Sequence, residues 1–136
     1  MRHFNLDSRD YHFTDTFEAG LVLSGSDAKS LRLNTCSFKG SRVDLIDNRP
    51  FIIGLFIPKY KYSNDTQDTT DTRPLLLSKK ELAKLISYRH QKYMAIPIKI
   101  YKKGKWFKLE FGVGKKLKKY EKRQQIKDRD LKRRGI

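Results

Sequence analysis

The residues of this chain that could do chemistry are mainly cations, and they are most concentrated at the C-terminus. Residues 114–136 contain eleven Lys or Arg and only three acidic residues. Their few apolar side chains do not gather on one helical face, because at about 100° per residue Ile126 points away from Leu117 and Leu131. We therefore expect a tail that is disordered when free and becomes helical where an anionic surface neutralises it. The surface that fits such a tail best is RNA.

Groups that could catalyse a reaction are not assembled in the sequence. Cys36 is the single cysteine and the histidines are scattered, so we predict neither a structural nor a catalytic metal. Asp65, Asp68 and Asp71 are regularly spaced, but they lack the glycine and the terminal glutamate of a calcium loop. The Gly-Lys pair at 114–115 lacks the first glycine and the Ser or Thr of a P-loop. We therefore expect that the protein is not an enzyme and that it binds no cofactor.

The overall charge favours a polyanionic partner. The chain has 136 residues, a net charge of +16 and a pI of about 10.0, which is typical of proteins that bind nucleic acid or an acidic membrane. Membrane is the weaker candidate, because the sequence has no apolar run of about 18 residues and no signal-peptide pattern. The lone cysteine favours a reducing, cytoplasmic compartment, with an organelle matrix as the open alternative.

The first part of the chain is predicted to contain one strand and one short helix. Residues 1–10 are polar and are expected to form a flexible N-terminus. The segment 11–23 is rich in aromatic and β-branched residues, which predicts a strand with a kink or bulge at Gly20. A serine followed three residues later by an aspartate resembles a capping box and predicts a short helix over 24–32.

Two pairs of strands are predicted farther along. Segments 36–47 and 50–58 have the composition of strands, and the residues at 47–50 have the composition of a turn between them. Segments 95–101 and 106–113 alternate apolar and polar residues around a Lys-Lys-Gly-Lys tetrapeptide. This alternation predicts a hairpin.

A second helix is predicted after a loop. The segment 59–73 has no periodicity and many turn formers, so it is predicted to be a loop. Ser78 and Glu81 form a capping box at the start of the following helical run. The apolar positions predicted to face the core are Leu82, Leu85 and Ile86.

Together these elements predict a mainly β fold. Several strands with two or three short helices, and no alternation of strand and helix, favour a small antiparallel β-barrel. Barrels of this size are common platforms for single-stranded nucleic acid. We therefore divide the chain into a flexible N-terminus at 1–10, an RNA-binding barrel at 11–113 and the basic tail at 114–136.

Four sequence motifs resemble the SmpB (small protein B) family when they are taken in order. Each is weak alone, but four with matching spacing are specific, and the resemblance runs from about 11 to 130. It implies an oligonucleotide-binding-like (OB-like) barrel without enzymatic activity. The motifs are FEAGLVLSGSDAKSLR (17–32), TRPLLLSKKELAKL (72–85), MAIPIKIYKKGKWFKLEFGVGKK (94–116) and YEKRQQIKDRD (120–130).

The resemblance also implies a function. Proteins of this family bind the tRNA-like domain of transfer-messenger RNA (tmRNA, also called SsrA) and deliver it to stalled ribosomes for trans-translation and peptide tagging. There the protein takes the place of the missing anticodon stem in the decoding site, and the tail lies in the empty messenger channel. Elongation factor Tu would be an indirect partner through charged tmRNA, and we expect a monomer. From the residues alone, a ribosomal or other structural RNA-binding protein with a basic tail remains the alternative.

The RNA contacts of the family fall on identifiable positions. The glutamate of the EAG motif is Glu18, the middle leucine of the LLL motif is Leu76, and the polar residue that follows is Ser78. The residues alone favour a solvated strand carboxylate for Glu18 and a helix cap for Ser78, and the family resemblance is what favours RNA contact at Glu18. Leu76 is expected to be half core and half contact surface. The full set predicted to bind tmRNA is Glu18, Lys29, Arg32, Arg73, Leu76, Ser78 and Lys79.

The tail is predicted to bind the ribosome and to become helical there. Tyr120 is its aromatic residue best placed to stack on a base. Trp106, in the last hairpin, is by contrast expected to pack in the core or at an edge. The predicted ribosome-binding residues of the tail are Lys115, Lys116, Lys118, Lys119, Tyr120, Lys122, Arg123, Lys127 and Arg129.

Overall fold

The computed structural model describes residues 2–33, 36–60 and 72–117. In this part of the chain seven strands form a single sheet. The strands are β1 (Arg2–Phe4), β2 (Tyr11–Leu21), β3 (Arg42–Ile46), β4 (Arg49–Ile53), β5 (Arg73–Leu76), β6 (Met94–Lys103) and β7 (Trp106–Lys116).

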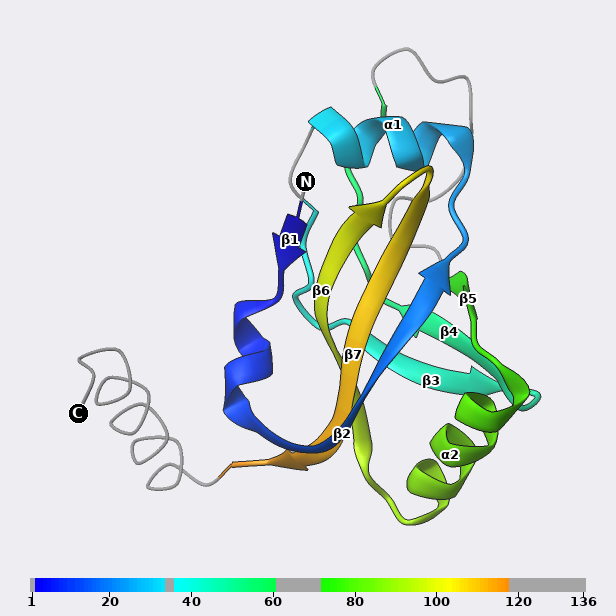
Figure 1. Cartoon of the computed structure of the whole chain (residues 1–136). Helices are drawn as coiled ribbons and strands as arrows, with labels where there is room; N and C mark the ends of the chain where they lie inside the picture. The colour runs from blue at the N-terminus through cyan, green and yellow to red at the C-terminus, as the bar shows by residue number, and fades with distance from the viewer. Residues whose placement is uncertain (1, 34–35, 61–71, 118–136) are drawn as a thin grey trace.

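The sheet closes into a ring. Its strand order is β1-β6-β3-β4-β5-β2-β7, and β6 also pairs with β7, so that β2 to β7 form the ring and β1 lies beside β6 (Figure 1). Every one of these pairings is antiparallel. The predicted mainly β, antiparallel fold is therefore confirmed, in the form of a ring-like sheet.

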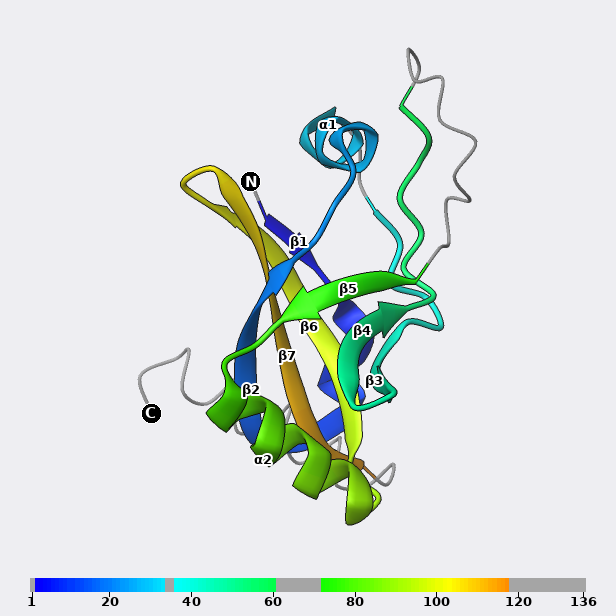
Figure 2. The same cartoon turned by 90° about the vertical axis from the view of Figure 1, so that its right-hand side faces the viewer.

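Three short helical segments accompany the sheet in the described part of the chain. They are the 3-10 helix η1 (Leu6–Asp10) and the α-helices α1 (Gly25–Leu33) and α2 (Lys79–His90). The views in Figures 1 and 2 place α1 and α2 at opposite ends of the ring. The prediction of two or three short helices is confirmed.

Both predicted helix caps are present. The Ser24 hydroxyl accepts the N–H of Asp27 at 3.0 Å, and the Ser78 hydroxyl accepts the N–H of Glu81 at 3.2 Å. Each cap satisfies an N–H group that has no partner within its helix. Of the three apolar positions predicted to be buried in the second helix, only Leu85 is fully buried.

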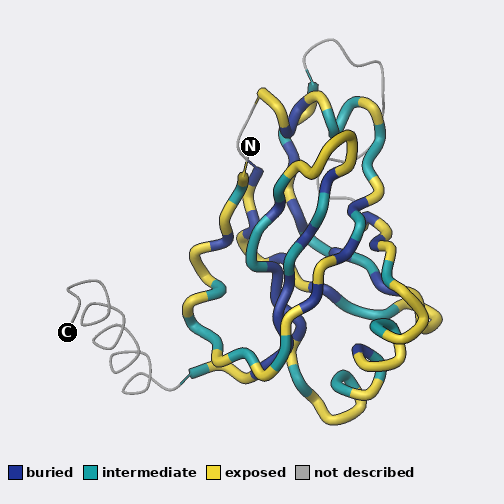
Figure 3. Tube along the Cα trace, in the orientation of Figure 1, coloured by how far each residue is buried: buried dark blue, intermediate teal, exposed yellow. Residues whose placement is uncertain are grey.

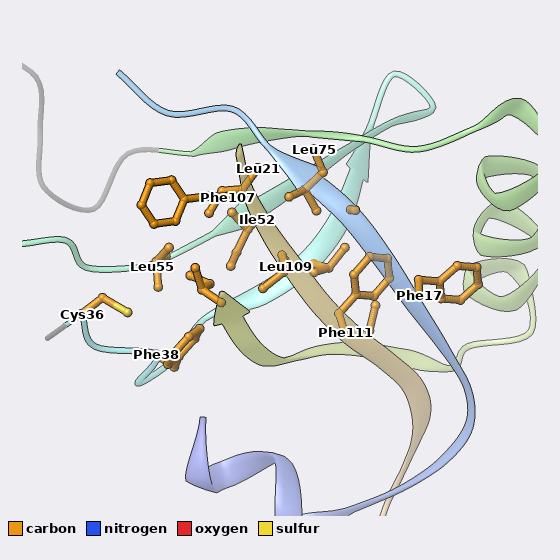
Figure 4. Packing of buried hydrophobic residues seen from close by; sticks show 14 of the residues in the cluster. Phe17, Leu21, Cys36, Phe38, Ile52, Leu55, Leu75, Phe107, Leu109 and Phe111 are labelled. Atoms are coloured by element: carbon orange, nitrogen blue, oxygen red, sulfur yellow. The ribbon is translucent and has the colours of Figure 1, made fainter. Parts of the chain in front are cut away.

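Alternation of buried and exposed side chains, clearest on β2, builds the core inside the ring. On β2, Phe17, Ala19 and Leu21 are buried while Glu18 is exposed, because successive side chains of a strand point to opposite faces. The rings of Phe17 and Phe111 stack with centroids 5.2 Å apart on the side of this core that faces α2 (Figure 4). Figure 3 shows the buried positions running along the strands of the ring.

Two tight turns have the backbone that their residues favour. Asp47 and Asn48 both have positive φ, 51° and 59°, between β3 and β4, as a two-residue hairpin turn requires. The last hairpin turns at Gly104, whose φ is 62°. The predicted turn and hairpin are confirmed, but the strands around the first turn are shorter than predicted, and Pro50 belongs to β4 opposite Leu45.

The N-terminus differs from the prediction. Residues 1–10 were expected to be flexible, but residues 2–10 form β1 and η1 in the structure. The side chain of Asn5 explains the order, because its amide donates to the Pro97 carbonyl at 2.8 Å and its oxygen accepts the N–H of Asp7. A polar composition therefore did not imply a loose chain.

The irregularity in β2 also lies elsewhere than predicted. The register shift falls between Phe13 and Asp15, not at Gly20. The ring of Phe13 lies over Gly112 on β7, where an added Cβ would come within 2.5 Å of it. Gly20 has another role, because it faces Leu76 across the β2–β5 pair.

Strand β5 was missed, because its sequence reads as the end of a loop and the approach to a helix. Only four residues long, it has the alternating burial of a strand, with Arg73 and Leu75 inside and Pro74 and Leu76 outside. It pairs with β4 on one edge and with β2 on the other. Without β5 the ring would be open between these two strands.

The tail begins later than position 114. Gly114, Lys115 and Lys116 are the last residues of β7 and pair with β2, and the N–H of Leu117 donates to the Asp10 carbonyl at 2.8 Å. The backbones approach so closely that a Cβ on Gly114 would lie 1.9 Å from the His12 carbonyl oxygen. The predicted boundary is therefore wrong by three residues or more.

Candidate nucleic-acid interface

Glu18 lies on the outer face of the ring among fixed charges. It is directly opposite Glu110 in the β2–β7 pair, and like charges in that position repel. Each carboxylate has its own lysine: Lys103 Nζ lies 3.7 Å from Glu18, and Lys99 Nζ lies 3.3 Å from Glu110. The two lysines both come from β6, so the last hairpin neutralises both carboxylates.

Tyr101 of β6 sets the protonation of Glu18. A hydrogen bond from the Tyr101 hydroxyl lowers the pKa of Glu18 below its ordinary 4.5, and Lys103 and Lys108 lower it further. The pKa of Tyr101 is raised to about 12, mainly because the side chain is partly buried and secondly because of its hydrogen bond to Glu18. At neutral pH the site therefore presents an ionised carboxylate, which can accept hydrogen bonds from base amino groups or a ribose hydroxyl but repels phosphate.

A groove of about 610 Å³ lies next to this carboxylate, between α1 and the tip of the β6–β7 hairpin. Lys108 joins the two features, because it lines the groove and also acts on the charge of Glu18. Figure 2 shows α1 and the hairpin tip at the same end of the molecule, with β5 crossing below them. The groove is lined by apolar and basic side chains, among them Val22, Ala28, Arg32, Leu76, Trp106 and Lys108.

Leu76 lies in this groove because of the glycine opposite. A Cβ on Gly20 would lie 3.3 Å from the Cβ of Leu76, so the glycine leaves room for the leucine to lie against β2. The neighbour Leu75 fills the core, while Leu76 is 65% exposed. Leu76 was expected to be half core and half contact surface, but its side chain is mainly on the surface.

Arg73 does not lie at the surface and is a correction to the predicted contact set. Its side chain is only 2% exposed. Its Nε donates to Asp27 of α1 at 2.9 Å, and its Nη1 donates to the Leu55 carbonyl at 2.7 Å. The arginine therefore ties α1 to the ring and cannot reach an RNA without unfolding this contact.

The other predicted contacts lie at two separate places. Arg32 is exposed on α1 and lines the groove, and Lys29, one turn away, lies with its Nζ 5.4 Å from the centroid of the Tyr60 ring. Ser78 and Lys79 are exposed at the start of α2, where the Ser78 hydroxyl also donates to Glu81 at 3.0 Å. The structure thus groups Arg32 with Leu76 and leaves Ser78 in its capping role.

Two of the predicted tail residues lie on β7. Lys115 and Lys116 are exposed, and Lys115 Nζ lies 5.3 Å from the centroid of the Tyr93 ring. The other tail positions lie outside the described residues: Lys118, Lys119, Tyr120, Lys122, Arg123, Lys127 and Arg129.

Sequence reasoning missed two features of the site. Trp106 was expected to pack in the core or at an edge, but its side chain is 73% exposed and lines the groove. Its position in the alternation of β7, in phase with Lys108 and out of phase with buried Phe107, carried the signal. Tyr101 could not have been linked to Glu18 without the strand register, because β7 lies between their two strands.

The described residues contain no group of three or more His, Cys, Asp or Glu side chains that could hold a metal ion. Cys36 is buried, and burial raises the pKa of its thiol to about 11, which makes it a poor nucleophile at neutral pH. No helix within the described ranges is long and apolar enough to cross a membrane.

Comparison with known proteins gives concordant matches. The chain matches the family model described as SmpB protein over residues 5–135. It is 39% identical over 126 residues to the SsrA-binding protein of Anoxybacillus flavithermus (strain DSM 21510 / WK1), which covers 91% of this chain and 82% of that protein. It is 41% identical over 130 residues to the SsrA-binding protein of Oceanobacillus iheyensis, covering 93% and 83%.

A solved structure has a similar fold. A chain of the structure called "tmRNA-SmpB: a journey to the center of the bacterial ribosome" superposes with a TM-score of 0.72 at 34% sequence identity. The match covers 88% of this chain and 87% of that one. The similarity therefore extends over most of both chains.

Proposed function

The chain belongs to the SmpB protein family, and from this premise we propose that it binds the tRNA-like domain of tmRNA and delivers it to stalled ribosomes for peptide tagging. Its relatives are named SsrA-binding protein, and its structural neighbour is described with tmRNA and the bacterial ribosome. The net charge of +16 supplies the attraction that any such RNA partner needs.

One observation carries this function. Two motifs far apart in the sequence meet at one surface, because Arg32 from the first and Leu76 from the second line the same groove. The glutamate of the first motif, Glu18, is near that groove, because Lys108 lines the groove and also interacts with the Glu18 carboxylate. A carboxylate acceptor, an apolar contact and cations in one place can read bases and bind phosphates together.

The tail has a different role in the proposal. The basic residues from Lys118 onward enter the messenger channel of the stalled ribosome and become helical on ribosomal phosphates, while the body of the protein occupies the decoding site. Strand β7, which ends at Lys116, runs away from α1 toward the other end of the ring (Figure 1). One protein can then hold tmRNA and the ribosome at opposite ends.

Other properties follow from this role. The protein acts as a cytoplasmic monomer, contacts elongation factor Tu only through charged tmRNA, and catalyses no reaction itself. The division into an RNA-binding ring and a ribosome-binding tail is part of the same proposal, as are the contacts of Lys29, Ser78 and Lys79.

A binding experiment tests the proposal. We expect the protein to bind tmRNA far more tightly than an unrelated structured RNA at near-physiological salt, and Glu18→Gln to lose much of that preference. Asp44→Asn is the control, because it removes the same charge from β3, where Asp44 pairs with Arg89 and Arg42. Equal binding of both RNAs by the wild-type protein would refute the proposal.

A tagging experiment tests the role of the tail. Removal of residues 118–136 should preserve much of the tmRNA binding and abolish peptide tagging on stalled ribosomes. Tyr120→Ala combined with neutral residues at Lys122 and Arg123 should have most of the same effect. Full tagging by the shortened protein would show that this division of roles is incorrect.

A further inference from the structure

Trp106 is exposed in a position that ordinary packing does not explain. At 73% it is the most exposed large apolar side chain among the described residues. It is the first residue of β7, and the strand's alternation directs it outward while Phe107 is buried. Exposed tryptophan is uncommon in monomeric proteins and is enriched at binding surfaces, where its large flat ring finds a partner.

The surroundings of Trp106 have the chemistry of a site for a base. The walls of the groove are apolar, with Leu76 from β5, Val22 and Ala28 among them. Its cations come from two directions: Arg32 lies on α1, and Lys105 and Lys108 belong to the β6–β7 hairpin. Among the described residues that line the groove none is acidic, so the groove attracts an anionic ligand that also has an apolar face.

We propose that Trp106 stacks on an unpaired base of the bound RNA, while Arg32 and Lys108 contact the phosphates beside that base. The groove would thus hold one nucleotide turned out of a loop, and this inference rests on the function proposed above. A peptide or lipid partner fits less well, since an apolar peptide would leave the cations unpaired. An unstacked nucleotide satisfies both the ring and the charges.

The two walls of the groove are held in place before any ligand arrives. On one side, the tight turn at Gly104, with φ of 62°, and the pairing of Trp106 with Lys103 fix the hairpin tip. On the other side, the buried ion pair between Arg73 and Asp27 fixes α1. A preformed groove loses less conformational entropy on binding, which favours affinity.

The single tryptophan of the chain allows a direct test. Because Trp106 is the only Trp, all tryptophan fluorescence reports on this site. We expect titration of the wild-type protein with the tRNA-like domain of tmRNA to quench this fluorescence to a plateau at the stoichiometry of binding. Trp106→Leu should weaken RNA binding about 10-fold to 100-fold, as loss of one stacked base does, and Trp106→Phe should retain most of the affinity.

Matched variants separate stacking from other effects. Leu6→Ala is the control for loss of an exposed apolar side chain, since Leu6 is 65% exposed on η1. Arg32→Ala and Lys108→Ala should each reduce the slope of log binding constant against log salt concentration by about one. Lys102→Ala, on the same hairpin but outside the groove, should leave this slope unchanged. The melting temperature of each variant should equal that of the wild type, because all four side chains lie at the surface or its edge.

The outcomes distinguish this inference from the proposed function. A wild-type protein that does not prefer tmRNA overturns both. A wild-type protein that prefers tmRNA while its fluorescence stays constant at saturation, or while Trp106→Leu binds as well as the wild type, overturns the stacking inference alone.

Discussion

The Tyr101 hydroxyl and the Glu18 carboxylate share a hydrogen bond that moves their pKa values in opposite directions. The bond lowers the pKa of Glu18 below its ordinary 4.5, and it adds to the effect of burial, the larger cause, in raising the pKa of Tyr101 to about 12. The bond crosses over β7, which lies between the strands of the two residues. Loss of the Tyr101 hydroxyl should therefore change the pKa of the Glu18 carboxyl.

Tyr101→Phe should raise the pKa of Glu18 toward its ordinary value. The favourable interactions of Glu18 are present above pH 4.5 and are lost as the pH falls through its lowered pKa, whereas those of Tyr101 are present below pH 10 and are lost as the pH rises toward about 12. An NMR titration of the Glu18 carboxyl carbon in both proteins measures the change. Tyr11→Phe is the control, and an identical Glu18 titration in Tyr101→Phe would contradict the bond.

Arg73→Met should destabilise the fold by about 3–5 kcal/mol, because it leaves Asp27 as an uncompensated charge that is only 13% exposed. Arg42→Met, which breaks an exposed pair with Asp44, should cost less than about 1 kcal/mol. Urea unfolding measures both. Combining Arg73→Met with Asp27→Asn should recover part of the loss, and equal effects of the two single changes would argue against a structural role for Arg73.

Gly114→Ala should destabilise the ring by about 1–3 kcal/mol or more, because the new methyl group would meet the His12 carbonyl oxygen and the strands must move apart. The control is Gly25→Ala, since a Cβ at Gly25, the first residue of α1, has no heavy atom within 4 Å. Thermal unfolding followed by circular dichroism compares the two variants. A Gly114→Ala variant as stable as Gly25→Ala would mean that the β2–β7 contact is looser than described.

Two truncations should differ sharply in stability. Removal of residues 118–136 leaves β7 whole, so the unfolding midpoint should stay nearly unchanged. Removal of residues 114–136 also takes away the end of β7 that pairs with Tyr11, His12 and Phe13, together with the bond from Leu117 to Asp10, and it should lower the midpoint by several degrees. Calorimetry of both proteins gives the comparison, and equal midpoints would show that the end of β7 contributes little.

Local patterns predicted most of the fold. The two serine caps, the turn at Asp47 and Asn48 and the last hairpin each depend on a few neighbouring residues whose preferences agree with the final structure. The order of the N-terminus depended on a distant partner, the Pro97 carbonyl that accepts from Asn5. No local pattern contains such a contact.

The candidate site was predictable only in part, for a similar reason. Glu18 and Leu76 were found from motifs, but the burial of Arg73 follows from its place inside β5, a strand too short to be recognised. The apolar-polar alternation of β7 could have revealed that Trp106 faces outward. A preference for burying tryptophan outweighed that pattern, and the structure shows that the pattern was correct.

The exit of the chain from β7 also has a mechanical meaning. β7 pairs along its length with β2 on one edge and β6 on the other, and Leu117 adds one more bond where the chain leaves it. Hydrogen bonds between antiparallel strands run across the strand axis, so a pull on the chain beyond Leu117 loads many of them in shear at once instead of peeling them one by one. A force applied to the chain beyond Leu117 would thus move the ring as one unit before it unfolds β7.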